Sequence, residues 1–148
     1  MKFNRVLASV MAAVGLMGVT APTASADSII IDGTKYNNCG GGFCLFYNSN
    51  QQGAYRMFFK SVPTFADGST FNTVGTSNSG YGKGVWNDAA SGAWWTSASN
   101  CVNCVSVGAT HARVYFNSNY MGSYDQFNKP NAGNLVHTKN ENASLYMY

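Results

Sequence analysis

Charged residues are scarce in this sequence, and no stretch of it gathers charges of one sign. Nine Lys and Arg and six Asp and Glu make up 10% of its 148 residues. Nucleic acids and acidic membrane surfaces are recognised by clustered Lys and Arg, so neither is an expected partner. No stretch is apolar over the roughly 20 residues that a membrane-spanning helix needs, so no membrane insertion is expected.

Long helices and catalytic motifs are also missing. Gly and Asn interrupt every candidate for a long helix, which favours short strands joined by turns. His111 and His137 stand alone, and neither a His-Glu-x-x-His run nor a nucleophile elbow occurs. The Gly40-Gly41-Gly42 run opens no helix that could hold a phosphate. We therefore expect one all-β domain that is not an enzyme.

The N-terminus reads as a targeting signal. A basic start precedes an apolar run, Val6 to Val19, that is too short for a membrane span, and Ala24-Ser25-Ala26 has the small residues that precede a signal-peptidase cut. These features predict a signal peptide over 1–26, a mature chain that begins at Asp27, and secretion to the extracellular space. Cleavage would remove Lys2 and Arg5. The mature chain then has seven Lys and Arg and six Asp and Glu, which gives a formal charge of +1.

Four cysteines follow the signal peptide as two close pairs, Cys39 with Cys44 and Cys101 with Cys104. An even number of cysteines in a secreted chain predicts two disulfides. Four cysteines allow three pairings, and the clustering favours bridges within each pair, which would fix the shape of two short loops. Structural zinc is disfavoured because the first pair has four intervening residues.

The most informative feature is an internal repeat. Leu45–Phe58 aligns without gaps on Val114–Phe127, with six of fourteen positions identical, and Asn87–Ser91 matches Asn140–Ser144 in the same order. In both early segments a β-prone triplet precedes Asn-Ser-Asn and then a glycine, which predicts a β-hairpin. Two such units predict two Greek-key motifs packed as a β-sandwich around one core.

The aromatic residues are expected in that core. Val85-Trp86 and Trp94-Trp95 flank the late segment of the first unit, and a small two-unit β domain needs large apolar side chains. A glycan-stacking platform made of the same tryptophans and the many tyrosines is the alternative. The first unit also has a longer middle, roughly Ser61 to Gly84, which is rich in Gly, Ser, Thr and Asn.

The hairpins resemble those of the βγ-crystallin superfamily. Tyr115-x4-Tyr120-x-Gly122 matches its hairpin signature, whereas Phe46-x4-Gln51-x-Gly53 of the first unit has Gln at the second aromatic position. The order of signal peptide, Cys-x4-Cys, aromatic strand, glycine hairpin and Asn-Asp-x-Ala-Ser is similar to that of secreted actinobacterial metalloproteinase inhibitors.

This resemblance implies a βγ-crystallin-like β-sandwich over 39–148. Motif one would span about 39–99 and motif two about 104–148, after an N-terminal arm or extra strand at 27–38. The fold is implied more firmly than the activity, because one fold hosts several functions.

The resemblance also implies inhibition of an extracellular, thermolysin-like metalloprotease. Such inhibitors insert a disulfide-anchored loop into the enzyme as a substrate mimic, with the reactive bond between a Cys and a following Val. This chain offers Cys101-Val102 and Cys104-Val105. Their Cys-x2-Cys spacing and the stretch 106–110 depart from the family pattern, and the alternative is a structural linker that a disulfide holds together.

Calcium binding is a second implication. In the superfamily's Asn/Asp-Asn/Asp-x-x-Ser/Thr-Ser motif, carboxylate, carbonyl and hydroxyl oxygens surround Ca²⁺. One carboxylate per site predicts weak affinity, and the alternative is that these residues only hold the loops by hydrogen bonds. The residues that match the ligand positions are Asn87, Asp88 and Ser91 in the first unit and Asn140, Glu141 and Ser144 in the second.

A third hypothesis is a killer-toxin-like protein that binds cell-wall polysaccharide, because related βγ proteins act on microbial cells. Under all three hypotheses the chain is expected to be a monomer that requires no cofactor, with Ca²⁺ as an optional ligand.

Overall fold

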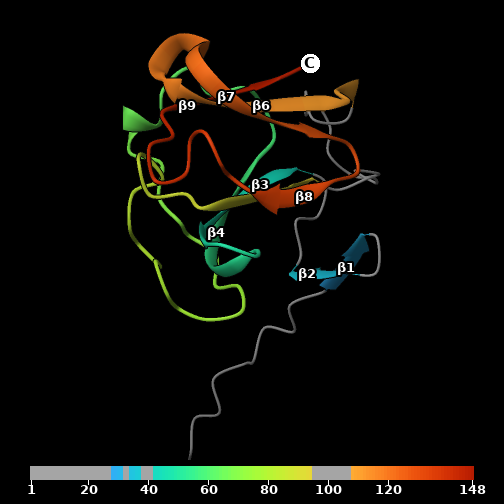
Figure 1. Ribbon diagram of the computed structural model, residues 1–148. Coiled ribbons are helices and arrows are strands. Elements are labelled where there is room, and N and C mark those ends of the chain that lie inside the picture. Colours follow the sequence, from blue (N-terminus) through green and yellow to red (C-terminus); the bar gives the residue numbers. More distant parts are fainter. Residues whose placement is uncertain (1–27, 32–33, 38–41, 95–107) are drawn as a thin grey trace, which may run out of the picture.

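The computed structural model describes residues 28–31, 34–37, 42–94 and 108–148 as an all-β protein. In the view of Figure 1, β6, β7 and β9 form a layer above β3, β4 and β8. Within the described ranges no helix has the length and apolar character needed to span a membrane. The strands are β1 (Ser28–Ile31), β2 (Thr34–Asn37), β3 (Phe43–Asn48), β4 (Gln52–Phe58), β5 (Ser91–Trp94), β6 (His111–Asn117), β7 (Met121–Asn128), β8 (Ala132–Asn134) and β9 (Ser144–Met147).

The two predicted hairpins are present as β3–β4 and β6–β7. Their turns share one backbone conformation: φ is 58° at Asn50 and 79° at Gly53, against 60° at Asn119 and 81° at Gly122. A Cβ on Gly53 would lie 2.8 Å from the carbonyl oxygen of Ser79, so this turn requires glycine both for its φ and for space. The two hairpin turns are therefore alike in backbone conformation as well as in sequence.

Each unit completes the sheet of the other. The first sheet has the order β4-β3-β5-β8, so β8 of the second unit pairs with β5 of the first, with Ala132 opposite Ala93. The second sheet has the order β7-β6-β9, and Val62 of the first unit bridges to Leu145 in β9. This exchange confirms the prediction of two Greek-key motifs packed as a sandwich.

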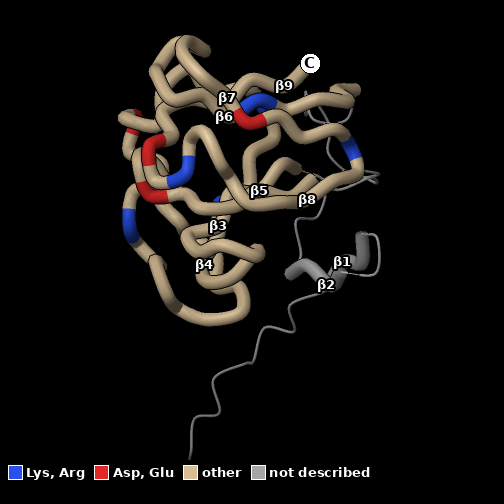
Figure 2. Tube along the Cα trace, in the orientation of Figure 1, with Lys and Arg blue, Asp and Glu red and all other residues tan. Residues whose placement is uncertain are grey.

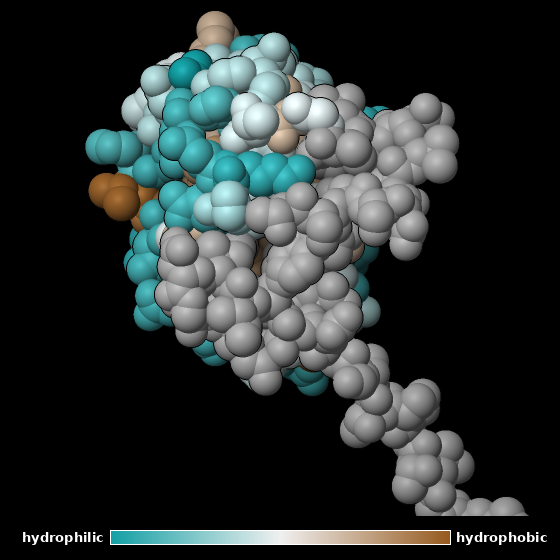
Figure 3. Space-filling view, turned by 90° about the vertical axis from the view of Figure 1, so that its right-hand side faces the viewer, coloured by the Kyte–Doolittle hydropathy of each residue, from teal (hydrophilic) through white to brown (hydrophobic). Residues whose placement is uncertain are grey.

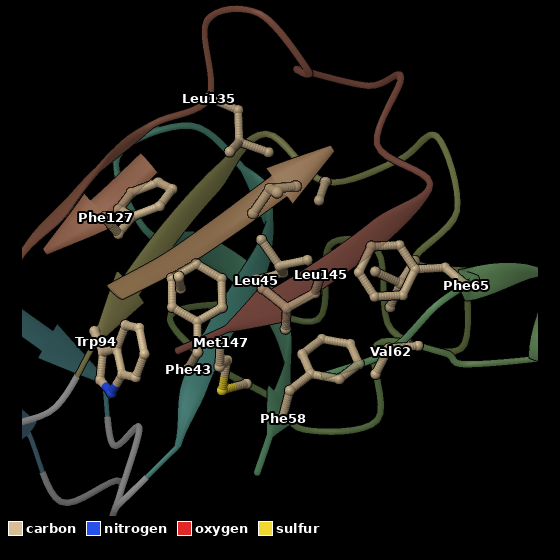
Figure 4. Packing of buried hydrophobic residues seen from close by; sticks show 14 of the residues in the cluster. Phe43, Leu45, Phe58, Val62, Phe65, Trp94, Phe127, Leu135, Leu145 and Met147 are labelled. Atoms are coloured by element: carbon tan, nitrogen blue, oxygen red, sulfur yellow. The ribbon is translucent and has the colours of Figure 1, made fainter. Parts of the chain in front are cut away.

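The larger hydrophobic cluster fills the space between the four-stranded and the three-stranded sheet (Figure 4). The ring of Phe43 in β3 lies 5.6 Å from that of Trp94 and 5.2 Å from that of Phe127 in β7. Both units therefore contribute to one core. Gly92 leaves room for two of these rings, because a Cβ there would lie 2.9 Å from Phe43 and 3.0 Å from Phe127.

The expectation that the aromatic residues are buried is only partly correct. Trp94 is fully buried, but Trp86 is 49% exposed. The N–H of Asp88 donates to the carbonyl of Val85, so Trp86 lies at the tip of a turn whose first residue already faces the core. Trp95 lies outside the described residues. The expectation of burial is also wrong for four tyrosines, whose exposed fractions are 40–57%: Tyr81, Tyr124, Tyr146 and Tyr148.

The long middle of the first unit is built from turns and short bridges. Its 3₁₀ helix η1 (Phe65–Asp67) places Phe65 in the core. The N–H of Phe71 donates to the carbonyl of Lys83, and Thr73 pairs with Tyr55 of β4. These backbone bonds satisfy polar groups that a long connection would otherwise leave unpaired.

A buried carboxylate holds the loop that follows β8. Asp125 of β7 accepts hydrogen bonds from the backbone N–H groups of Val136, His137 and Thr138, and from the hydroxyl of Thr138 at 2.7 Å. Hydrogen bonds to a charged acceptor are the stronger kind. This carboxylate therefore fixes the chain just before the late loop of the second unit.

Replacing Asp125 by alanine should lower the free energy of unfolding by about 3 kcal/mol, because buried donors lose a charged acceptor. Asp67→Ala is the matched control, since the carboxylate of Asp67 is exposed and accepts from the N–H of Ser69 two residues away. Chemical denaturation of both variants measures the difference. Equal stability of the two variants would show that Asp125 does not hold this loop.

Candidate functional site

The late loops of the two units lie side by side and are hydrogen-bonded to each other. The N–H of Asn87 donates to the carbonyl of Asn142 at 2.9 Å, and the N–H of Asn140 donates to that of Ala89 at 2.8 Å. Both donors have left-handed backbone, with φ of 61° at Asn87 and 56° at Asn140. The loops are therefore joined by a reciprocal pair of bonds, as expected for an approximate twofold relation between the units.

The side chain of Asn142 breaks this symmetry. It is fully buried; its Nδ2 donates to the carbonyl of Val85 at 2.8 Å and its Oδ1 accepts from the N–H of Ala89 at 2.9 Å. The aligned residue of the first unit is Ala89, which has no such side chain. One amide thus fastens the loop of the second unit to the loop of the first.

Two clefts flank the joined loops. The Glu141 cleft has a volume of about 340 Å³ and the Asp88 cleft a volume of about 310 Å³. The Glu141 cleft is lined by Trp86, Asn87, Phe116, Asn117, Ser118, Glu141 and Ala143. The Asp88 cleft is lined by Tyr47, Asn48, Ser49, Asp88, Ala90, Lys139 and Asn140.

The linings of the two clefts correspond position by position in the repeat. Each cleft combines the hairpin and the acid of one unit with the left-handed Asn of the other. The structure therefore brings Asn87 together with Glu141, and Asn140 together with Asp88. Asn87 and Asp88 are adjacent in the sequence, but in the folded chain they line different clefts. The same holds for Asn140 and Glu141.

The two predicted serine ligands are buried behind the clefts. The hydroxyl of Ser91 donates to the carbonyl of Asn48 at 2.6 Å and accepts from the N–H of Gln51. The hydroxyl of Ser144 makes the matching pair of bonds, donating to Asn117 and accepting from Tyr120. Each serine thus braces the hairpin turn of its own unit.

Calcium would find few charged ligands in either cleft. Within the described residues no group of three or more His, Cys, Asp or Glu is arranged to hold a metal. Ca²⁺ takes six to eight oxygens, so the single carboxylate, the amides and a serine hydroxyl would need backbone or water oxygens as well. Lys139 adds a cation to the Asp88 cleft, where the other cleft has Trp86. The Glu141 cleft therefore fits a weakly bound Ca²⁺ better.

A second cation lies beside the Asp88 cleft. The ammonium group of Lys83 donates to the hydroxyl of Tyr47 at 2.8 Å, and this hydrogen bond raises the pKa of Lys83 above its ordinary value. Lys83 thus adds a second positive charge near the Asp88 cleft, which reinforces the preference for the Glu141 cleft.

The candidate inhibitory residues Cys101, Val102, Cys104 and Val105 lie outside the described residues, as does Cys39. Cys44 is fully buried in β3 and is not a free thiol. The pairing of the four cysteines stays a prediction.

The segment that links the two units has both of its ends held at one corner. On leaving β5, the N–H of Trp94 donates to the carbonyl of Asn131 at 2.8 Å. Just before β6, the carbonyl of Thr110 accepts from the N–H of Lys129 at 2.9 Å. Because Lys129 and Asn131 belong to the same turn between β7 and β8, the two ends of the link start from neighbouring, fixed points. No motif in the sequence indicates this corner.

Comparison with known proteins identifies the fold. No family model matches the chain, and no curated protein matches it. A solved structure from work on the evolution of the eye lens beta-gamma-crystallin domain fold is similar, with a TM-score of 0.52 and 13% identity over 78% of this chain and 93% of its own. The chain therefore has the βγ-crystallin fold that the hairpin motifs predict.

Replacing Asn142 by alanine should lower the free energy of unfolding by about 2 kcal/mol, because the N–H of Ala89 and the carbonyl of Val85 lose their partner in a buried place. The exposed Asn72→Ala is the control and should change stability by less than about 0.5 kcal/mol. Thermal and urea unfolding of both variants test this. A neutral Asn142→Ala would mean that the loops do not depend on this amide.

Proposed function

We propose that this protein is a secreted, monomeric, non-enzymatic inhibitor of extracellular thermolysin-like metalloproteases. It presents the segment around Cys101-Val102 and Cys104-Val105 to the protease as a substrate mimic. The observation that carries the proposal is the corner at Lys129–Asn131, which holds both ends of the link between the units. The order of sequence motifs and the βγ-crystallin fold support it.

A link that starts and ends on a rigid core suits a substrate mimic. Its ends cannot move apart on binding, so less conformational entropy is lost when the protease closes around it. Each candidate bond has valine on its C-terminal side, and thermolysin-like enzymes favour a bulky apolar residue there. A disulfide between Cys101 and Cys104 would also keep both ends together after a cut at Cys101–Val102, the bond inside the bridged loop.

Titration of a thermolysin-like protease should show stoichiometric loss of peptidase activity at micromolar inhibitor or below. One of the two variants Val102→Asp and Val105→Asp should weaken inhibition by about tenfold or more, because a carboxylate enters an apolar subsite without a partner. Val74→Asp is the matched control, since Val74 is 48% exposed and belongs to a different loop. Full activity of several such proteases in the presence of the wild-type protein would remove the inhibitor proposal.

Weak calcium binding in the Glu141 cleft is a second candidate function. The matched geometry of the two clefts favours it, because each gathers a carboxylate, an amide and a hydroxyl from both units. Calcium would then tie the units together and stabilise the fold, without a role in the contact with the protease.

Calcium should raise Tm, with a stabilisation of about 1.4 kcal/mol at ten times the Kd. Glu141→Gln should abolish most of this shift and Asp88→Asn less of it, because Lys139 opposes a cation in the Asp88 cleft. Asp67→Asn, outside both clefts, should leave the shift unchanged. Differential scanning fluorimetry measures all four proteins, and a flat wild-type Tm through the millimolar range would sink the calcium proposal.

A further inference from the structure

The outer side of the three-stranded sheet carries an aromatic surface. Along β6, Ala112 and Val114 face the core, so Arg113 and Tyr115 face outward. Tyr146 in β9 lies opposite Arg113, and Tyr124 in β7 lies opposite Tyr115. We call this surface the tyrosine face, and it consists of Arg113, Tyr115, Tyr120, Tyr124, Tyr146 and Tyr148.

Its rings form a continuous chain of contacts across the three strands. The ring of Tyr115 lies 5.4 Å from that of Tyr124 and 6.2 Å from that of Tyr120. Tyr146 then lies 5.1 Å from Tyr120 and stacks on Tyr148 at 5.5 Å, with 21° between the planes. The contacts hold each ring in place, so a ligand would meet a preformed surface.

The side chain of Arg113 joins the two ends of this chain of rings, Tyr124 and Tyr148. Its guanidinium carbon lies 4.5 Å from the ring centroid of Tyr124 and 4.9 Å from that of Tyr148. Its Nε donates to Oε1 of Gln126 at 2.9 Å, and the contacts observed within the described ranges give it no carboxylate. Asp125, the nearest acid along β7, is buried and bound to the loop after β8. The tyrosine face thus holds a cation without an anionic partner.

The hairpin signature of the fold accounts for Tyr120 and for Tyr115, which is only 8% exposed, but it does not account for the exposed rings of the tyrosine face. Leu145 and Met147 of β9 fill the core, while their neighbours Tyr146 and Tyr148 are each 40% exposed and Tyr124 is 41% exposed. Exposed aromatic side chains gathered in one place indicate a binding surface. Among the described residues on the side shown in Figure 3, aliphatic hydrophobic colour is confined to small, separate spots.

We propose that the tyrosine face binds a polysaccharide that carries carboxylate groups. The flat rings can stack on the C–H faces of sugar rings, while tyrosine hydroxyls and the amide of Gln126 hydrogen-bond to sugar hydroxyls. The guanidinium of Arg113 pairs with a sugar carboxylate, because its planar N–H groups match the two carboxylate oxygens. This proposal is independent of the protease-binding segment.

Charge disfavours two other occupants. A nucleic acid would present phosphates to several Lys and Arg, but this face has a single Arg, and the Lys and Arg in Figure 2 are few, with several of them beside Asp or Glu. A symmetric dimer would place the same patch on both partners. Two Arg113 side chains would then come together without an acid between them.

Affinity electrophoresis in native gels with embedded polygalacturonate tests the proposal on the secreted full chain. The wild-type protein should be retarded, and Tyr148→Ala and Arg113→Gln should each weaken retardation by about tenfold or more in apparent Kd. Tyr81→Ala is the matched control, because Tyr81 is 57% exposed and outside the tyrosine face. Arg113→Lys should recover part of the binding, since it keeps the charge but not the planar geometry. Equal Tm values across the variants would exclude misfolding.

Four results would overturn the proposal. The first is no retardation of the wild-type protein by polygalacturonate. The second is equal retardation by neutral hydroxyethylcellulose, which would remove the role of the carboxylate. The third is tighter binding of a single-stranded oligonucleotide than of polygalacturonate. The fourth is a concentration-dependent dimer that Tyr148→Ala dissociates.

Discussion

The two units exchange segments, and both large sheets are completed by this exchange. Val62 exchanges backbone bonds with Leu145 in the sheet of the second unit, and Ala132 pairs with Ala93 in the sheet of the first. Neither unit can close its own sheet, and both line one core. The relative position of the two sheets is therefore set by packing between the units.

Three surfaces follow from that exchange. The late loops are brought together by the bonds of Asn87 and Asn140, which creates the paired clefts. Because β8 pairs with β5, the turn before β8 lies beside the first sheet. There it holds both ends of the link between the units. The sheet of β6, β7 and β9 has a core on one side only, so its other side is free to carry the tyrosine face. The fold alone assigns none of these a function.

Sequence reasoning recovered the features that local chemistry specifies. The hairpins follow from Asn and Gly at turn positions, and the repeat gave the number of units and the fold. It missed features that depend on distant residues. Gln51 departs from the aromatic pattern because its side chain binds the carbonyls of Gly92 and Gly133, and the motif that lists Asn87 beside Asp88 cannot show that the two line different clefts. Trp86 and Tyr146 are likewise exposed because their neighbours Val85 and Leu145 occupy the positions that face the core.

The central claim is that the link between the units is a substrate mimic held on a rigid base. Mass-spectrometric mapping of the protein after long incubation with a thermolysin-like protease tests it most directly. A substrate mimic should receive one slow cut, at Cys101–Val102 or Cys104–Val105, with both fragments retained by the folded core and inhibition still present. Rapid cuts elsewhere in the chain, or an intact link beside a fully active protease, would contradict it.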